Sequence, residues 1–331
     1  MSRPALIAAV LAGTLLVLAN LGIASYAPRH FSPQYTLERC MSSRADVLLL
    51  GTSTMVAAAD EALLSGRVGR RVCNAAVGAT APFEHRLELR RLLEAGSPRV
   101  IVYGWSIGQL LPAPLNPGEL VGNRAVAYSW SRFEDVRVAY PNFPPRDLEN
   151  GFSFLARRAV PLLTYGSLID GRLEALHRSI DGDQREKNQF GAKEDFEKLA
   201  RDAWVSLPRD LETATHAGTV ALSPHVLEMR QLAHAAGARM LWVAMPLTSE
   251  ARRTAAKLPA YRAYFDRAAA VLGADGDAFL DASALPELPD TVFNDGLHVA
   301  GPGARLFSEW LANEIERRGL LGPAPDSASQ R

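Results

Sequence analysis

The sequence has little cysteine, no net charge and no concentrated basic segment. Its 36 lysine and arginine residues balance 36 aspartate and glutamate residues, so electrostatics gives no case for binding nucleic acid. Two cysteines, Cys40 and Cys73, occur in 331 residues, and neither has a histidine partner at metal-ligand spacing. We therefore expect no metal site, no cofactor and no nucleic-acid partner.

The two cysteines leave two alternatives open. They can pair if the chain works in an oxidising compartment. However, Cys73 lies in a short apolar segment that predicts a strand, where a buried free thiol is the commoner state. The sequence favours the free thiol over the disulfide.

Charge is also absent from a long segment near the amino terminus. No charged residue occurs from Pro4 to Pro28. At about 1.5 Å per residue, this apolar run is long enough to cross a hydrocarbon core of roughly 30 Å. We predict that residues 1–28 form a transmembrane signal anchor and that the remaining chain lies outside the cytoplasm. A cleaved signal peptide and a buried core helix remain alternatives.

Strand-like and helix-like segments alternate after this anchor, which predicts a parallel sheet between two layers of helices. The expected strands cover residues 46–50, 71–75, 99–103, 239–245 and 278–281, and the expected helices cover residues 56–64, 82–94, 224–236, 250–272 and a closing segment from residue 301. The predicted fold is a three-layer α/β/α domain over residues 29–321, with a five-stranded, mainly parallel sheet. The Pro/Ser/Ala-rich residues 322–331 predict a disordered tail.

Residues 109–221 interrupt this alternation and predict an insertion on the loop after the third strand. Loops at that edge of a sheet build substrate sites. Within the insertion, the segment from Phe152 to Leu163 is apolar and carries the basic pair Arg157 and Arg158. It predicts either a surface that faces a membrane or a partner, or a local hydrophobic subcore with solvated arginines.

Two short segments at opposite ends of the chain predict a split catalytic site. The apolar run 47–50 stops at Gly51 and delivers Ser53 to the carboxyl end of a strand, where open α/β sheets bind ligands. Near the other end, one tight turn can hold Asp295 against one imidazole nitrogen of His298 while the other nitrogen faces the serine. Ser53, His298 and Asp295 are therefore the candidate nucleophile, base and orienting carboxylate. A helix N-cap at Ser53 is the alternative.

The other histidines lack this context. Only His298 has a carboxylate at a useful spacing. His85, for example, lies among charged residues of a predicted helix, which favours a surface or interfacial position. Of the seven histidines in the sequence, His298 is therefore the one that we expect to act as the base.

These segments resemble the motifs of the SGNH, or GDSL-like, hydrolase family. Gly51-Thr52-Ser53 stands where that family has Gly-Asp-Ser, and the sequence from Asp295 to His298 matches its late Asp-x-x-His motif. Residues 74–80 look like its second block, and by this resemblance Gly78 donates a backbone N–H to the oxyanion. The resemblance implies a flavodoxin-like arrangement of the sheet and a covalent acyl-serine.

The third block of the family is altered here. That family commonly has Gly-x-Asn-Asp after the third strand, whereas this chain has Gly104-Trp-Ser106-Ile. Ser106 is one candidate to replace the missing asparagine. Alternatively, the oxyanion hole consists of the N–H groups of Ser53 and Gly78 alone, without a donor that is usually worth a few kcal/mol.

The apolar anchor and these motifs are similar to the membrane-anchored SGNH proteins that work with multispanning O-acyltransferases of the cell envelope. This similarity implies a serine acyl esterase or O-acyltransferase in the cytoplasmic (inner) membrane, facing the periplasm or exterior. Its expected partners are an acylated or acyl-accepting polysaccharide and a multispanning membrane acyltransferase. A free-standing periplasmic esterase of small or lipid esters and a non-catalytic assembly factor are the alternatives.

Overall fold

The computed structural model describes residues 3–30, 32–112, 124, 126–127, 129–140, 148–166, 169, 187–188, 191–216, 219–285 and 288–322. The chain divides into two compact units. The amino-terminal unit comprises Met1–Glu38 and Pro114–Asp183, and the sheet unit comprises Arg39–Ala113 and Gln184–Arg331. The predicted insertion, residues 109–221, is thus divided between the two units.

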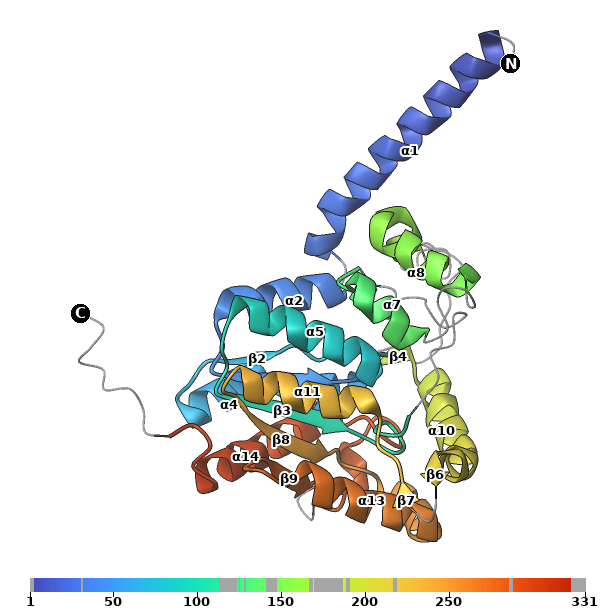
Figure 1. The fold of residues 1–331 in the computed structure, drawn as a ribbon. Coiled ribbons are helices and arrows are strands. Elements are labelled where there is room, and N and C mark those ends of the chain that lie inside the picture. Colours follow the sequence, from blue (N-terminus) through green and yellow to red (C-terminus); the bar gives the residue numbers. More distant parts are fainter. Residues whose placement is uncertain are drawn as a thin grey trace, which may run out of the picture. The chain divides into compact units, whose positions relative to one another are not determined.

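Five parallel strands form the main sheet of the sheet unit (Figure 1). They are β1 (Val47–Gly51), β2 (Val72–Asn74), β3 (Val100–Trp105), β8 (Arg239–Ala244) and β9 (Ala278–Asp281). Their order across the sheet is β2-β1-β3-β8-β9, and every neighbouring pair is parallel. The winding direction reverses between β1 and β3. Such a reversal opens a crevice at the carboxyl ends of the strands, where ligands bind.

Helices cover both faces of this sheet. One face carries α3 (Ser53–Ala58), α4 (Glu61–Val68) and α14 (Gly301–Arg317), and the other carries α5 (Pro82–Ala95), α11 (Pro224–Ala235) and α13 (Pro259–Leu272). Helices α5 and α11 lie side by side (Figure 1). Because both faces are covered, strand residues that point either way are apolar, as in β1 and β3. The predicted three-layer α/β/α fold is confirmed.

Two of the predicted helices are each divided in two. The expected helix at 56–64 is replaced by α3 and α4, because Asp60 caps α4 by accepting the N–H of Leu63 at 3.0 Å. The expected helix at 250–272 is replaced by α12 (Ser249–Ala256) and α13. Pro259 explains this break, since it has no N–H and holds the preceding residue in an extended conformation.

Cys40 and Cys73 form a disulfide, so the expectation of a free thiol at Cys73 is wrong. The bond joins α2 (Ser32–Ser43) to β2, which is an edge strand of only three residues. Beside it, Arg39 pairs with Glu61 at 2.6 Å and donates to the carbonyl oxygen of Asn74 at 3.1 Å. The sequence showed the burial of Cys73 but not which helix would pack against its strand.

The amino-terminal unit begins with α1 (Arg3–His30). Among the described residues, this is the one helix long and apolar enough to cross a membrane, with a candidate span of Arg3–Tyr26. None of the most apolar part of this span is buried within the protein. By length and composition alone, a signal sequence near an amino terminus meets the same criteria.

The described residues between β3 and α11 add helices and two hairpins. The helices are α7 (Phe133–Ala139), α8 (Leu148–Ala159) and α10 (Lys193–Ala214), and the hairpins pair β4 (Lys187–Asn188) with β5 (Gly191–Ala192) and β6 (Thr215–His216) with β7 (Thr219–Val220). Helix α8 overlaps the apolar segment from Phe152 to Leu163, which predicts either an exposed contact surface or a local subcore. Its Phe154 is fully buried against Tyr140, whereas Phe152 is 60% exposed. Residues 323–331, most of the predicted tail, lie outside the described residues.

Candidate active site

The end of β1 forces a sharp turn that carries Ser53 to the crevice. Gly51 has a φ of +144°, a value that favours glycine. A Cβ atom at this position would lie 2.5 Å from the carbonyl oxygen of Gly104 on β3. The chain can therefore pass this close to β3 only with glycine at position 51. Two residues later, Ser53 begins α3 at the point where the winding of the sheet reverses.

The hydroxyl of Ser53 contacts an imidazole rather than capping a helix. Its Oγ lies 2.8 Å from Nε2 of His298, although 245 residues separate the two in sequence. The N-cap of α3 is Thr52, whose side chain makes no capping hydrogen bond. The N-cap alternative for Ser53 is therefore not what the structure shows.

Asp295 holds the other side of the same imidazole. Nδ1 of His298 lies 2.8 Å from Oδ2 and 3.0 Å from Oδ1 of Asp295. Oδ1 also accepts the backbone N–H groups of Leu297 and His298, each at 2.8 Å. The turn is closed by the N–H of Asn294, which donates to the carbonyl oxygen of His298 at 2.7 Å. These bonds fix both the carboxylate and the ring, and α14 begins three residues after the histidine.

The surroundings keep the carboxylate of Asp295 ionised. Burial raises its pKa, but the hydrogen bond and charge of His298 and the two backbone N–H groups lower it, and the net pKa lies below its usual value. An ionised Asp295 accepts a hydrogen bond from Nδ1–H of His298. In that tautomer, Nε2 is unprotonated and can accept the proton of the Ser53 hydroxyl. Side chains of Asp295 and His298 are both buried.

Gly78 lies directly against Ser53. A Cβ atom at Gly78 would be 3.5 Å from Cβ of Ser53, so any larger residue would occupy space beside the nucleophile. The loop that carries it stays close to β1, because the N–H of Val77 donates to the carbonyl oxygen of Gly51 at 3.0 Å. The next residue, Ala79, has a φ of +57°, which is strained for a non-glycine residue.

A buried polar network supports this loop. The hydroxyl of Thr80 donates to the carbonyl oxygen of Val77 at 2.6 Å and lies 2.8 Å from Nε2 of His85. Nδ1 of His85 lies 2.8 Å from the hydroxyl of Tyr103 on β3. His85 is fully buried, so the surface or interfacial position expected for it is wrong. The charged residues that flank His85 in sequence indicated an exposed helix face, but two of them, Glu84 and Glu88, are buried as well.

Ser106 follows β3, the strand beside β1, at the same edge of the sheet. Its N–H donates to Oε1 of Gln109 at 3.1 Å, and the next residue, Ile107, has a φ of +47°. The loop after β3 is therefore strained at Ile107, as the Gly78 loop is at Ala79, and it lies next to the loop that carries Ser53. An interaction of the Ser106 hydroxyl with a developing oxyanion stays a prediction.

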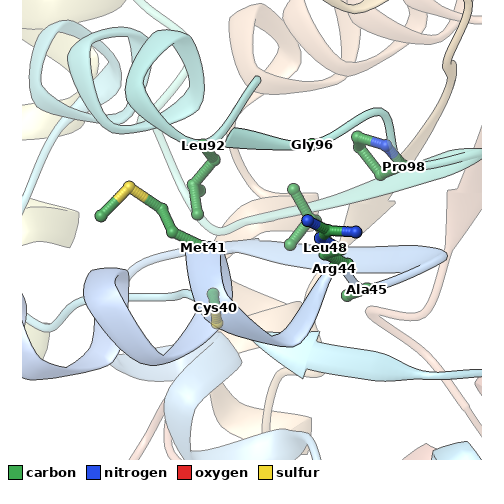
Figure 2. A pocket seen from close by; sticks show the side chains of 8 residues that line it. All are labelled: Cys40, Met41, Arg44, Ala45, Leu48, Leu92, Gly96 and Pro98. Carbon is green, nitrogen blue, oxygen red and sulfur yellow. The ribbon is translucent and has the colours of Figure 1, made fainter. Parts of the chain in front are cut away.

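A small hollow lies at the opposite, amino-terminal edge of the sheet (Figure 2). Met41, Leu48, Leu92 and Pro98 are among the side chains that line it. Its internal space of about 10 Å³ is enough for roughly one water molecule, so it cannot hold an acyl ester. Within the described ranges, histidine, cysteine and acidic side chains form no group of three or more that could hold a metal ion.

Comparisons with known proteins add little to this geometry. No protein-family model matches the sequence, and no curated protein matches it. A solved structure that resembles the chain is the crystal structure of a "putative acylhydrolase" from Bacteroides fragilis NCTC 9343. The two share 11% identity, and the match covers 82% of this chain and 86% of that chain with a TM-score of 0.36. This likeness is too distant to carry an argument about function, so the chemistry rests on the residues described above.

Proposed function

We propose that this protein is a membrane-anchored, extracytoplasmic SGNH-type serine esterase or O-acyltransferase that acts in acylation of a cell-envelope or exported polysaccharide. The observation that carries the proposal is the hydrogen-bonded series from Ser53 through His298 to Asp295, with 2.8 Å at both contacts of the ring. A serine hydroxyl is a poor nucleophile at neutral pH by itself. This arrangement supplies both the base and the group that orients it.

The proposed reaction has two halves. In the first, Oγ of Ser53 attacks the acyl carbonyl while its proton moves to Nε2 of His298, and the N–H groups of Ser53 and Gly78 face the oxyanion. The tetrahedral intermediate then collapses, the ester bond breaks, and the leaving alcohol takes the proton from His298. In the second half, water or a sugar hydroxyl gives its proton to Nε2 of His298 and attacks the acyl-serine carbonyl. The bond between the acyl group and Oγ of Ser53 then breaks, and His298 returns the proton to that oxygen.

The proposed location outside the cytoplasm has two supports. Helix α1 is long and apolar enough to cross a membrane, and Cys40 and Cys73 are joined in a disulfide. Disulfides persist mainly in oxidising compartments. A reporter that is active only after export should therefore be active when fused after Arg331. A silent export reporter together with an active cytoplasmic reporter at the same junction would remove the envelope role.

The acceptor of the acyl group on Ser53 distinguishes an esterase, which uses water, from a transferase, which uses a polysaccharide hydroxyl. The polysaccharide and a multispanning membrane acyltransferase enter the proposal through the sequence resemblance. Full-length protein, loaded with an acyl group on Ser53, should release it faster to a polysaccharide hydroxyl than to water if the protein is a transferase. Equal release with and without the polysaccharide would favour the free-standing esterase.

The nucleophile is tested by covalent labelling. A fluorophosphonate should label Ser53, and Ser53→Ala and His298→Ala should each abolish labelling without changing the fold. Ser283 is a matched control, because it also follows a strand of the sheet and its hydroxyl donates to a carboxylate, that of Asp281. Ser283→Ala should therefore leave labelling intact. Label that persists in Ser53→Ala and maps to another serine, such as Ser106, would contradict the assignment.

A further inference from the structure

Helix α8 of the amino-terminal unit presents apolar side chains to its surroundings. Leu148 is 47% exposed and Phe152 is 60% exposed, and Leu163, just beyond the helix, is 49% exposed. The spacing of four residues between the first two places them on one side of the helix. An exposed apolar stripe of this kind is typical of helices that lie in a membrane interface or against another protein.

The opposite side of α8 fixes the direction of this stripe. Phe154 is fully buried, and its ring centroid lies 6.1 Å from that of Tyr140, which follows α7. In the last turn of α8, Arg157 donates to the carbonyl oxygen of Leu163 at 2.9 Å, so the segment after the helix folds back toward it. The exposed side therefore cannot turn inward without breaking the packing of Phe154.

The segment after α8 is joined to α1. The N–H of Leu162 donates to Oδ1 of Asn20 at 2.9 Å, while Nδ2 of Asn20 donates to the carbonyl oxygen of Leu16 at 3.1 Å. Nearby, Ile23 of α1 packs against a small buried cluster that contains Val126 and Tyr165. An asparagine in an apolar span is costly unless its polar atoms are bonded. Here both ends of the amide have partners.

This contact sets the depth of the segment in a bilayer. From Arg3 to Asn20, α1 rises by about 26 Å at roughly 1.5 Å per residue. The hydrocarbon core is roughly 30 Å thick. If Arg3 lies at one boundary, Asn20 and the Leu162 bonded to it lie close to the other boundary. Leu163, which follows Leu162 directly, is then held near the level of the outer headgroups, and α8 leads into this segment.

We propose that Leu148, Phe152 and Leu163 form a second membrane contact, inserted at the headgroup–acyl boundary of the same bilayer that α1 crosses. This inference rests on the proposed anchoring through α1 and extends it. The partner is the lipid surface, because the hydrogen bond between Leu162 and Asn20 ties the segment that follows α8 to the helix proposed to cross the bilayer.

Nitroxide labels on the full-length protein in liposomes test the contact. The native cysteines form a disulfide, so single cysteines introduced at Phe152→Cys and Leu163→Cys can be labelled separately under non-reducing conditions. Leu15→Cys, which is 67% exposed on α1, reports the span, and Val205→Cys, which is 80% exposed in the sheet unit, is the apolar control in water. Accessibility to oxygen, relative to a water-soluble nickel chelate, gives the depth of each label.

We expect the oxygen-to-nickel ratio to be highest at position 15, intermediate at positions 152 and 163, and lowest at position 205. Ratios at both 152 and 163 that equal the ratio at 205, with position 15 in lipid, would overturn the second contact and leave the anchor standing. A water-exposed label at position 15 would overturn the anchor and this inference together. Melting curves that match those of the unmodified protein would establish that each variant is folded. Positions 152 and 163 are labelled separately, so that if one variant fails to fold the other still tests the contact.

Discussion

The two units differ in how many of their large apolar side chains are exposed. Among the described residues of the sheet unit, large apolar side chains are exposed only at Val56, Val205 and Leu227. The amino-terminal unit exposes them along most of α1 and again around α7 and α8, for example at Phe133 and Phe152. Soluble proteins rarely leave large contiguous apolar patches in water. The described surface of the sheet unit is therefore mainly polar, whereas the amino-terminal unit exposes the apolar side chains on which the proposed membrane attachment rests.

Buried charged groups are distributed in the reverse way. The sheet unit buries ionisable side chains at several places, including Asp295, His298, His85 and Glu88, whereas among the described residues of the amino-terminal unit only Asp135 is a buried acidic or basic side chain. Most of these sheet-unit groups have specific hydrogen-bond partners, and the partnered ones surround Ser53 or support the loop of Gly78. This difference agrees with the proposed function, in which the sheet unit carries out the reaction and the amino-terminal unit attaches the protein to the membrane.

The largest effect should come from the orienting carboxylate. Asp295→Asn should lower the rate of Ser53 acylation by about 10⁴-fold, because the amide favours the wrong imidazole tautomer. The loss should be measured as the initial rate of fluorophosphonate labelling. Adding Asp295→Asn to His298→Ala should cause little further loss, since the groups act as one unit. Independent, multiplying losses would show that the series does not work as proposed.

The next largest effect should separate the two sides of α8. Phe154→Ala should destabilise the amino-terminal unit by about 3–5 kcal/mol, because it removes a fully buried ring. Phe152→Ala should change stability by no more than about 0.5 kcal/mol, because this ring is largely exposed. Hydrogen exchange of the full-length protein in liposomes measures both. Equal destabilisation would mean that α8 is only a subcore and would break the contrast between the units.

The disulfide should act on the sheet unit alone. Replacing both Cys40 and Cys73 by alanine should lower its free energy of unfolding by about 3–4 kcal/mol, from the closure of a loop between residues 33 apart. Urea unfolding, followed by the fluorescence of the sheet tryptophans, would measure this loss. The depth of labels on α8 should stay unchanged. A shift of those labels would show that the units are coupled through α2.

The smallest effect should come from Glu88, which is fully buried and has no hydrogen-bond partner for either carboxylate oxygen among the described residues. Burial, and then the charge of Glu84, raise its pKa well above the ordinary 4.5. The folded state therefore binds this proton more tightly than the unfolded state, and its contribution to stability falls as pH rises above 4.5.

Glu88→Gln removes this pH dependence. The variant should be more stable than the unmodified protein at neutral pH, by about 1–3 kcal/mol, because a buried unpaired charge is no longer at risk of forming. The gain should shrink as pH falls below the ordinary carboxyl pKa. Thermal melting at several pH values checks the sign. A variant that is less stable at pH 7 would mean that the carboxyl has an undetected favourable role.

Much of the sheet could be predicted from the sequence because its strands are continuous apolar runs that end at glycine or polar residues. The strand from 278 to 281 was predicted with the observed ends, and the others differ by one or two residues at an end. The helix breaks at Asp60 and Pro259 were missed, although both residues carry local signals. An aspartate at a helix start and a proline inside an apolar pattern were outweighed by the periodicity around them.

The sequence by itself determined the α/β fold, the apolar amino-terminal helix and the three candidate site residues Ser53, Asp295 and His298, because these depend on local patterns such as the end of a strand or the spacing of three residues between Asp295 and His298. Only the tertiary structure decided that Cys40 meets Cys73, that His85 is buried behind the Gly78 loop, and that Leu162 bonds to Asn20. Each of these contacts joins segments that come together in space only when helices pack on the sheet or on α1. No local pattern encodes which helix will cover which strand, since many apolar faces are equally suited to burial.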